Sequence, residues 1–153
     1  MSENELPENE SRWCVLLPCS SQETWAVPQK CVAEIVTLPT EASSPPAELL
    51  WRGRDVPILD LDRANVAPWR DSRAATGLVA VMLGLKGGSW EYYGVALRGD
   101  GLKMKDLSGE QLEDVPELAL KGSSAAFRMK GKVYQIPDLA SLPDRQDSQR
   151  SAA

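Results

Sequence analysis

Short apolar runs separated by turn residues dominate the chain, and this pattern is typical of strands. The segments 13–17 and 24–27 are rich in Trp, Val, Leu and Thr, which favour a pleated and half-buried surface. The polar tetrad 20–23 between them has turn composition. We expect these two strands to form a hairpin, ended by Pro18 and Pro28, because proline cannot donate to a ladder.

The same pattern repeats to the end of the chain. Further strands are expected at 34–38, 56–61, 78–85, 90–97, 102–105, 125–129 and 132–136. A single helical turn is expected before the strand at 34–38, and loops are expected at 40–47, 63–77 and 108–123. About eight to ten short strands with frequent turns predict an all-β barrel or sandwich with almost no helix.

The stretch from Leu50 to Asp62 stands out, because an arginine-flanked glycine opens into an apolar strand. Gly53 is the natural place for a positive φ. Pro57 predicts that the strand lies at a sheet edge, at its own start or at a bulge, with a local gap in backbone pairing. Two arginines and a tryptophan beside such a strand favour a binding surface over an active site.

Charge and composition exclude several function classes. The net charge is −5, and residues 1–11 contain four glutamates and no Lys or Arg, so the rest of the chain is nearly neutral. A neutral body offers little to a phosphate backbone, so we expect no nucleic-acid partner. The chain has no histidine, which removes the commonest general base and metal ligand. We therefore expect no enzyme activity, no cofactor and no metal.

The three cysteines, Cys14, Cys19 and Cys31, are an odd number and fit a reduced, cytoplasmic protein. Cys14 lies in an apolar run, so it should act as a small buried hydrophobe. The N-terminus has no signal-peptide pattern, and no apolar run is long enough to insert into a membrane. We expect a disordered acidic tail at 1–11, a folded domain at 12–142 and a disordered polar tail at 143–153.

Three segments in order resemble the CheW-like domain, the adaptor module of bacterial chemosensory arrays. Trp25-Ala26-Val27-Pro28 followed by Val32-Ala33-Glu34-Ile35-Val36 is similar to the family's "YAlPv…V.EVv". The segment 51–61, WRGRDVPILDL, is similar to its "LRG.vvPVvDL", and 131–139 is similar to its closing strand. The chain departs from the family at Trp51, where leucine is common, and at 94–100, which match poorly. The Trp-containing variant is most similar to the divergent, ChpC-like adaptors of type IV pilus chemosensory systems, which act in twitching motility.

The resemblance implies two small five-stranded β-barrel lobes without a catalytic site. It implies a cytoplasmic scaffold for chemotaxis signal transduction, which couples methyl-accepting chemoreceptors to a CheA-type histidine kinase and contacts other CheW-like domains. The partner-binding residues would be Glu34, Trp51, Arg52, Gly53, Arg54, Pro57 and Asp60.

Each site residue also has an alternative role in the fold. Arg52 either reads a partner carboxylate through its planar fork or pairs with Glu34 or Asp60 in its own chain. Trp51 and Trp69 are partner anchors or core residues. Asp60 is expected to cap a turn at the strand end rather than take part in acid–base chemistry.

Two other function classes remain open at the level of sequence. One is a small β-barrel module that binds a ligand in an apolar cavity between the lobes, and the other is a cysteine-dependent enzyme. The adaptor is favoured, because the arginine motif carries the family resemblance.

Overall fold

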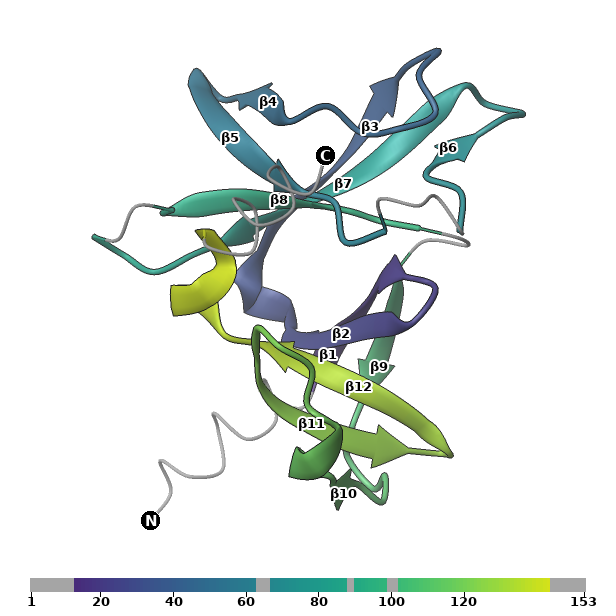
Figure 1. Cartoon of the computed structure of the whole chain (residues 1–153), viewed down its shortest axis with the longest axis vertical. Coiled ribbons are helices and arrows are strands. Elements are labelled where there is room, and N and C mark those ends of the chain that lie inside the picture. Colours follow the sequence, from purple (N-terminus) through teal and green to yellow (C-terminus); the bar gives the residue numbers. More distant parts are fainter. Residues whose placement is uncertain (1–12, 63–66, 88–89, 99–101, 144–153) are drawn as a thin grey trace.

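The apolar runs pair into strands that make up two lobes (Figure 1). The computed structural model describes residues 13–62, 67–87, 90–98 and 102–143. The expectation of an all-β fold with little helix is confirmed. The strands are β1 (Trp13–Ser20), β2 (Glu23–Pro28), β3 (Val32–Pro39), β4 (Glu48–Trp51), β5 (Arg54–Leu59), β6 (Arg70–Asp71), β7 (Thr76–Leu83), β8 (Tyr92–Ala96), β9 (Lys103–Asp106), β10 (Glu113–Asp114), β11 (Ser123–Met129) and β12 (Lys132–Pro137). Three single 3-10 turns accompany them, η2 (Gln29–Cys31), η3 (Pro116–Leu118) and η4 (Leu139–Ser141).

Each lobe is built on one six-stranded sheet. The lower sheet in Figure 1 has the order β10-β11-β12-β2-β1-β9, and the upper sheet has the order β3-β7-β8-β5-β4 with β6 added beside β7. Each sheet therefore has five longer strands, as expected, and one strand of two residues. Neighbouring strands are antiparallel except for the parallel pairs β2–β12 and β5–β8.

A shared hydrophobic core joins the two lobes. The lower sheet contributes alternate residues of β1 and β2, including Leu17 and Trp25, which are fully buried. The upper sheet contributes alternate residues of β7 and β8, including Met82 and Val95. Because side chains alternate across a strand, the residues between these point to the opposite face. The lobes are thus packed face to face through one core.

Each sheet also encloses a smaller core on its other face. Leu16 and Ala26 of the lower sheet pack with Met129 and Tyr134. In the upper sheet, Val79 belongs to one small cluster, while Val81 packs with Trp51 and Val56 in another. Strands buried on both faces need apolar residues at consecutive positions, which explains the continuous apolar run of β7.

The expectation that Pro18 ends a strand is wrong, and one of the three positions expected for Pro57, the sheet edge, is excluded. Pro18 does not end β1, which continues to Ser20 with a shift of register between Pro18 and Ser20. A register shift of this kind is one of the places where a strand tolerates proline. The strand that contains Pro57 is not at the sheet edge, because β5 lies between β4 and β8.

The pairing of β4 with β5 explains how Pro57 fits inside the sheet. The Ile58 N–H donates to the Ala47 carbonyl at 2.9 Å, so Ile58 is a hydrogen-bonded position of this antiparallel pair. Hydrogen-bonded and non-hydrogen-bonded positions alternate, so Pro57, which faces Glu48, needs no N–H toward β4. On the other side, pairing with β8 begins at Ile58.

Two regions that were expected to be loops contain short strands. β6 and the start of β7 lie within 63–77, and β10 lies within 108–123. The predicted tails 1–11 and 143–153 lie outside the described residues, except for Pro143. Among the residues that the structure describes, no helix is long and apolar enough to cross a membrane.

Candidate functional site: the arginine hairpin

The β4–β5 turn places two arginines at the exposed tip of the upper lobe. Trp51 pairs with Arg54, so Arg52 and Gly53 form a two-residue loop. Both loop residues have positive φ, 50° and 80°, as a type I′ turn requires. The glycine prediction is confirmed. Arginine is not a residue that this turn prefers, so its presence at the first loop position points to a role for the side chain. We call Trp51, Arg52, Gly53 and Arg54 the arginine hairpin.

Glu34 on β3 holds one half of the arginine hairpin. Its Oε1 accepts a hydrogen bond from the Trp51 indole N–H at 2.9 Å, and the same oxygen lies 3.3 Å from Nη2 of Arg52. The Arg52 guanidinium carbon lies 4.5 Å from the centre of the Trp51 ring. One carboxylate and one indole thus orient the guanidinium, and the favourable face of the ring adds a cation–π contact.

The other half repeats this arrangement with residues of β8 and the chain before it. The Arg54 guanidinium carbon lies 4.8 Å from the centre of the Tyr92 ring, and its Nη1 lies 3.7 Å from Oε1 of Glu91. The rings of Trp51 and Tyr92 are 5.1 Å apart and tilted. The two arginines therefore lie on either side of an aromatic pair.

The surface of the arginine hairpin is accessible although its base is buried. Trp51 is buried in the small core of the upper lobe, whereas the Arg52 side chain is 67% exposed and that of Glu34 is 46% exposed. An arginine fork has five N–H donors and suits bidentate contact with a carboxylate. The arrangement presents oriented guanidinium groups to solvent.

The structure brings together most, but not all, of the predicted site residues. Glu34, Trp51 and Arg52 contact one another, and Gly53 and Arg54 complete the turn. Pro57 lies farther along β5 and Asp60 lies beyond its end. The alternative in which Arg52 pairs with Glu34 is what the structure shows.

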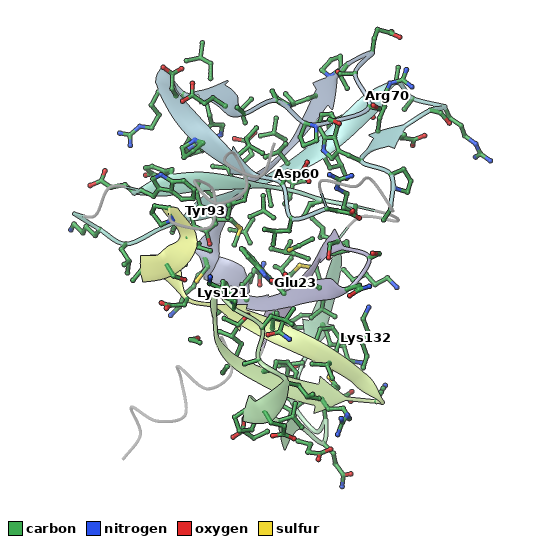
Figure 2. The ribbon with its side chains drawn as sticks, viewed as in Figure 1. Glu23, Asp60, Arg70, Tyr93, Lys121 and Lys132 are labelled. Carbon is green, nitrogen blue, oxygen red and sulfur yellow. The ribbon has the colours of Figure 1, made fainter. Side chains whose placement is uncertain are left out.

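Asp60, which Figure 2 labels, forms an ion pair with the buried Arg98. Its Oδ1 accepts the Asp62 backbone N–H at 3.1 Å, so the expected turn cap is confirmed. The same oxygen pairs with Nη2 of Arg98, while Nη1 of Arg98 donates to the Ala67 carbonyl at 2.9 Å. Arg98 is 1% exposed and Asp60 is 22% exposed.

Sequence reasoning missed three members of these arrangements. Arg98 is not among the predicted site residues. The arginine that directly follows the apolar run Val95-Ala96-Leu97 was an available signal, because an arginine that is buried with such a run needs a paired partner. Glu91 and Tyr92 gave no signal, since their approach to Arg54 depends on the parallel pairing of β5 with β8.

Trp69, the second proposed anchor, is a core residue in the structure. It is buried, and its indole N–H donates to the Leu78 carbonyl at 2.9 Å. Its ring lies on Gly77, where a Cβ would fall 2.3 Å from ring carbons. Only a glycine therefore leaves room for this ring.

The cysteines have the features of packing residues. Cys14 and Cys19 are buried, and burial raises the pKa of the Cys14 thiol, which lowers its thiolate fraction. The Cys19 thiol donates to the Leu17 carbonyl at 3.4 Å. In the part of the chain that the structure describes, no three His, Cys, Asp or Glu side chains are grouped to hold a metal ion.

Comparison with known proteins adds no family assignment. No protein-family model matches the chain, and no curated protein sequence matches it. The functional argument therefore depends on the residues and on their geometry.

Proposed function

We propose that this protein is a non-enzymatic adaptor of a bacterial chemosensory system. It acts in the cytoplasm and couples methyl-accepting chemoreceptors to a CheA-type histidine kinase, and it also contacts other CheW-like domains. Its output is chemotaxis or type IV pilus twitching motility. The proposal rests on the resemblance of three sequence segments to the CheW-like family. It also rests on the two-lobed all-β fold, which is consistent with that family.

The single observation that carries the proposal is the exposed Arg52 guanidinium, held by Glu34 and Trp51 at the tip of a rigid turn. A side chain that is already oriented loses less conformational freedom when a partner binds, and this favours affinity. Aromatic residues and arginine also dominate the energetics of protein–protein interfaces. Pre-organised arginines that lie over packed aromatic rings therefore suit a surface for reversible partner contacts.

The test is capture of a CheA-type kinase and of a chemoreceptor signalling tip by the purified protein. We expect wild type to capture at least one of them and Arg52→Ala to bind about tenfold more weakly, which corresponds to about 1.4 kcal/mol. The far-UV circular dichroism and the melting temperature of the variant should stay close to those of wild type, because an exposed ion pair contributes little to stability.

Arg128→Ala is the matched control. Arg128 forms an ion pair with Glu113 at 2.8 Å in the other lobe, so the substitution removes the same side chain and a similar contact. It should leave capture unchanged. Failure of wild type to capture either partner would contradict the proposed adaptor function. Equal losses of affinity in Arg52→Ala and Arg128→Ala would show that the loss does not depend on which lobe carries the arginine.

A further inference from the structure

The lower lobe carries a second charged surface, which the adaptor proposal does not use. Four lysines of β9 and of the β11–β12 hairpin belong to it, and we call them the lysine cluster: Lys103, Lys105, Lys130 and Lys132. The arginine hairpin lies in the other lobe and pairs each arginine with a glutamate. The lysine cluster differs, because its contacts in the described chain include only one carboxylate, that of Glu110.

Strand register places these lysines around one face of the lower sheet. Lys103 is opposite Leu16 in the β1–β9 pair, and Lys105 lies on the same face of β9 two residues later. Leu16 packs in the small lower core together with Tyr134, whose ring lies 5.5 Å from Nζ of Lys132. Positive charges from β9 and from β12 thus border the same small core (Figure 2 labels Lys132).

Glu110 fixes the spacing of two of these charges. Its Oε2 lies 3.1 Å from Nζ of Lys105 and 3.8 Å from Nζ of Lys130, so the two ammonium groups are within about 7 Å of each other. The carboxylate occupies the point where they converge, which leaves no room for a small anion there. The remaining positive charge is spread along the face rather than concentrated at one point.

Tyr134 anchors one of the lysines to the small lower core. Its side chain is buried, and its ring stacks on that of Phe127 at a centre-to-centre distance of 5.5 Å. The ammonium group of Lys132 lies over this ring, so the core below fixes where that charge is presented.

We propose that the lysine cluster binds an acidic segment of a partner protein in extended conformation. Alternate side chains of an extended segment point to the same side, so its carboxylates can face a row of lysines. Charge complementarity supplies the attraction, and four lysines against one glutamate leave a local excess of positive charge in a chain whose net charge is −5.

An acidic peptide fits this surface better than a nucleic acid does. The same lobe carries Glu113, Asp114 and Glu117, which would repel any polyanion long enough to reach them. The lysines are point charges that attract carboxylate and phosphate alike, so the length of the polyanion decides between the two. A short segment of carboxylates needs neither a long positive track nor bidentate contacts.

The test measures the fluorescence anisotropy of a labelled peptide of about ten residues, with glutamate and serine in alternation. Wild type should bind it at an ionic strength of about 0.01 M, where the Debye length is about 30 Å, and should bind more weakly at about 0.15 M. The double variant Lys103→Glu, Lys132→Glu should bind about tenfold more weakly or worse, since two attractive charges become repulsive. The variant leaves Lys105 and Lys130, which hold Glu110, in place.

The matched control is Lys30→Glu together with Lys86→Glu. Both lysines are exposed and lie outside the cluster, so the net charge changes equally. The control should retain affinity within about twofold of wild type. If thermal melting shows that the Lys103→Glu, Lys132→Glu variant does not fold, the neutral double variant Lys103→Gln, Lys132→Gln is measured in its place.

Three results would overturn the assignment. The first is no binding of the peptide by wild type at low ionic strength. The second is an equal loss of affinity in the control, which would indicate an effect of overall charge. The third is tighter, lysine-dependent binding of a single-stranded DNA oligonucleotide than of the peptide, which would assign the surface to nucleic acid.

Discussion

Two of the arginine–carboxylate pairs of the upper lobe, Arg98–Asp60 and Arg52–Glu34, have the same chemistry and opposite surroundings. Arg98 and Asp60 lie inside the fold, where Arg98 is 1% exposed, whereas Arg52 and Glu34 lie at a hairpin tip, where Arg52 is 67% exposed. Removing one partner of a buried pair leaves the other without its counter-charge in surroundings that water solvates poorly. An exposed pair contributes little to stability, because water replaces either partner at small cost. The comparison separates an arginine that maintains the fold from one that is available to a partner.

The buried pair also makes more contacts than the exposed one. Arg98 bonds to Asp60 and to the Ala67 carbonyl, and its backbone N–H donates to the Pro18 carbonyl of β1 at 2.8 Å. These contacts join the chain after β8, the chain after β5 and a strand of the other lobe. The Arg98 side chain therefore joins the chain after β8 to the chain after β5, and its backbone adds a bond to the other lobe.

The largest expected effect is that of Arg98→Ala. It should lower the free energy of unfolding by about 3–5 kcal/mol, because it removes a fully buried side chain together with its bonds to Asp60 and to the Ala67 carbonyl. Urea denaturation followed by tryptophan fluorescence measures this change. Asp60→Asn, which keeps the shape of the side chain, serves as a second variant if Arg98→Ala does not fold. A loss below about 1 kcal/mol in both variants would contradict the difference between the two pairs.

Trp51→Phe should have an intermediate effect, because Trp51 connects the small core to the exposed pair. Phenylalanine keeps an aromatic ring near Tyr92 but loses the N–H that bonds to Glu34. The expected destabilisation is about 1–2 kcal/mol, from one hydrogen bond to a charged group and part of a cation–π contact. Urea denaturation gives the value, and a loss as large as that of Arg98→Ala would show that the base of the hairpin is as critical as the buried pair.

Arg52→Ala should have a smaller effect on stability, below about 1 kcal/mol at low ionic strength. Salt screens exposed charges, so the difference between wild type and variant should shrink at about 1 M salt, where the Debye length is about 3 Å. Thermal melting of wild type and Arg52→Ala at low and at high salt measures this difference in stability. A difference that does not change with salt would mean that Arg52 acts through packing of its stem on Trp51.

The smallest effect concerns Glu110, whose ion pairs lie at the surface of the lower lobe. The hydrogen bond from Lys105 lowers the pKa of Glu110 below its ordinary value of 4.5, so the pair adds stability above pH 4.5 and loses it as the pH falls through the lowered pKa. Glu110→Gln should therefore be less stable than wild type at pH 7, and the two should converge in acid. Melting temperatures from pH 2 to pH 8 test this, and a difference that is constant over the range would exclude the ion pair as its cause.

Two hairpins, β4–β5 and β11–β12, have a turn that consists of a basic residue followed by glycine, and the sequence alone indicates such turns. Gly53 and Gly131 both adopt positive φ, and the predicted strands 125–129 and 132–136 leave only Lys130 and Gly131 between them for a tight turn. Turn chemistry is local, so a few neighbouring residues determine it. The apolar run of β7 was also predictable, since its length and composition specify a strand buried on both faces.

The order of strands in the sheets could not be predicted in the same way. The position of Pro57 allowed three interpretations, and the structure places its strand inside the sheet, because the missing N–H falls at a non-hydrogen-bonded position. Which carboxylate Arg52 would choose was also open. Glu34 lies 18 residues away in sequence, and only the folding of β3 beside the β4–β5 hairpin decides the pairing.

The measurement that tests the account most directly is the affinity of Arg52→Ala for the captured kinase or chemoreceptor tip, determined by calorimetric titration beside the wild-type protein. We expect the variant to bind about tenfold more weakly while its melting temperature stays close to that of wild type, because the exposed pair contributes to contact rather than to the fold. Unchanged affinity in the folded variant would contradict the account, since the exposed arginine would then have no part in partner binding.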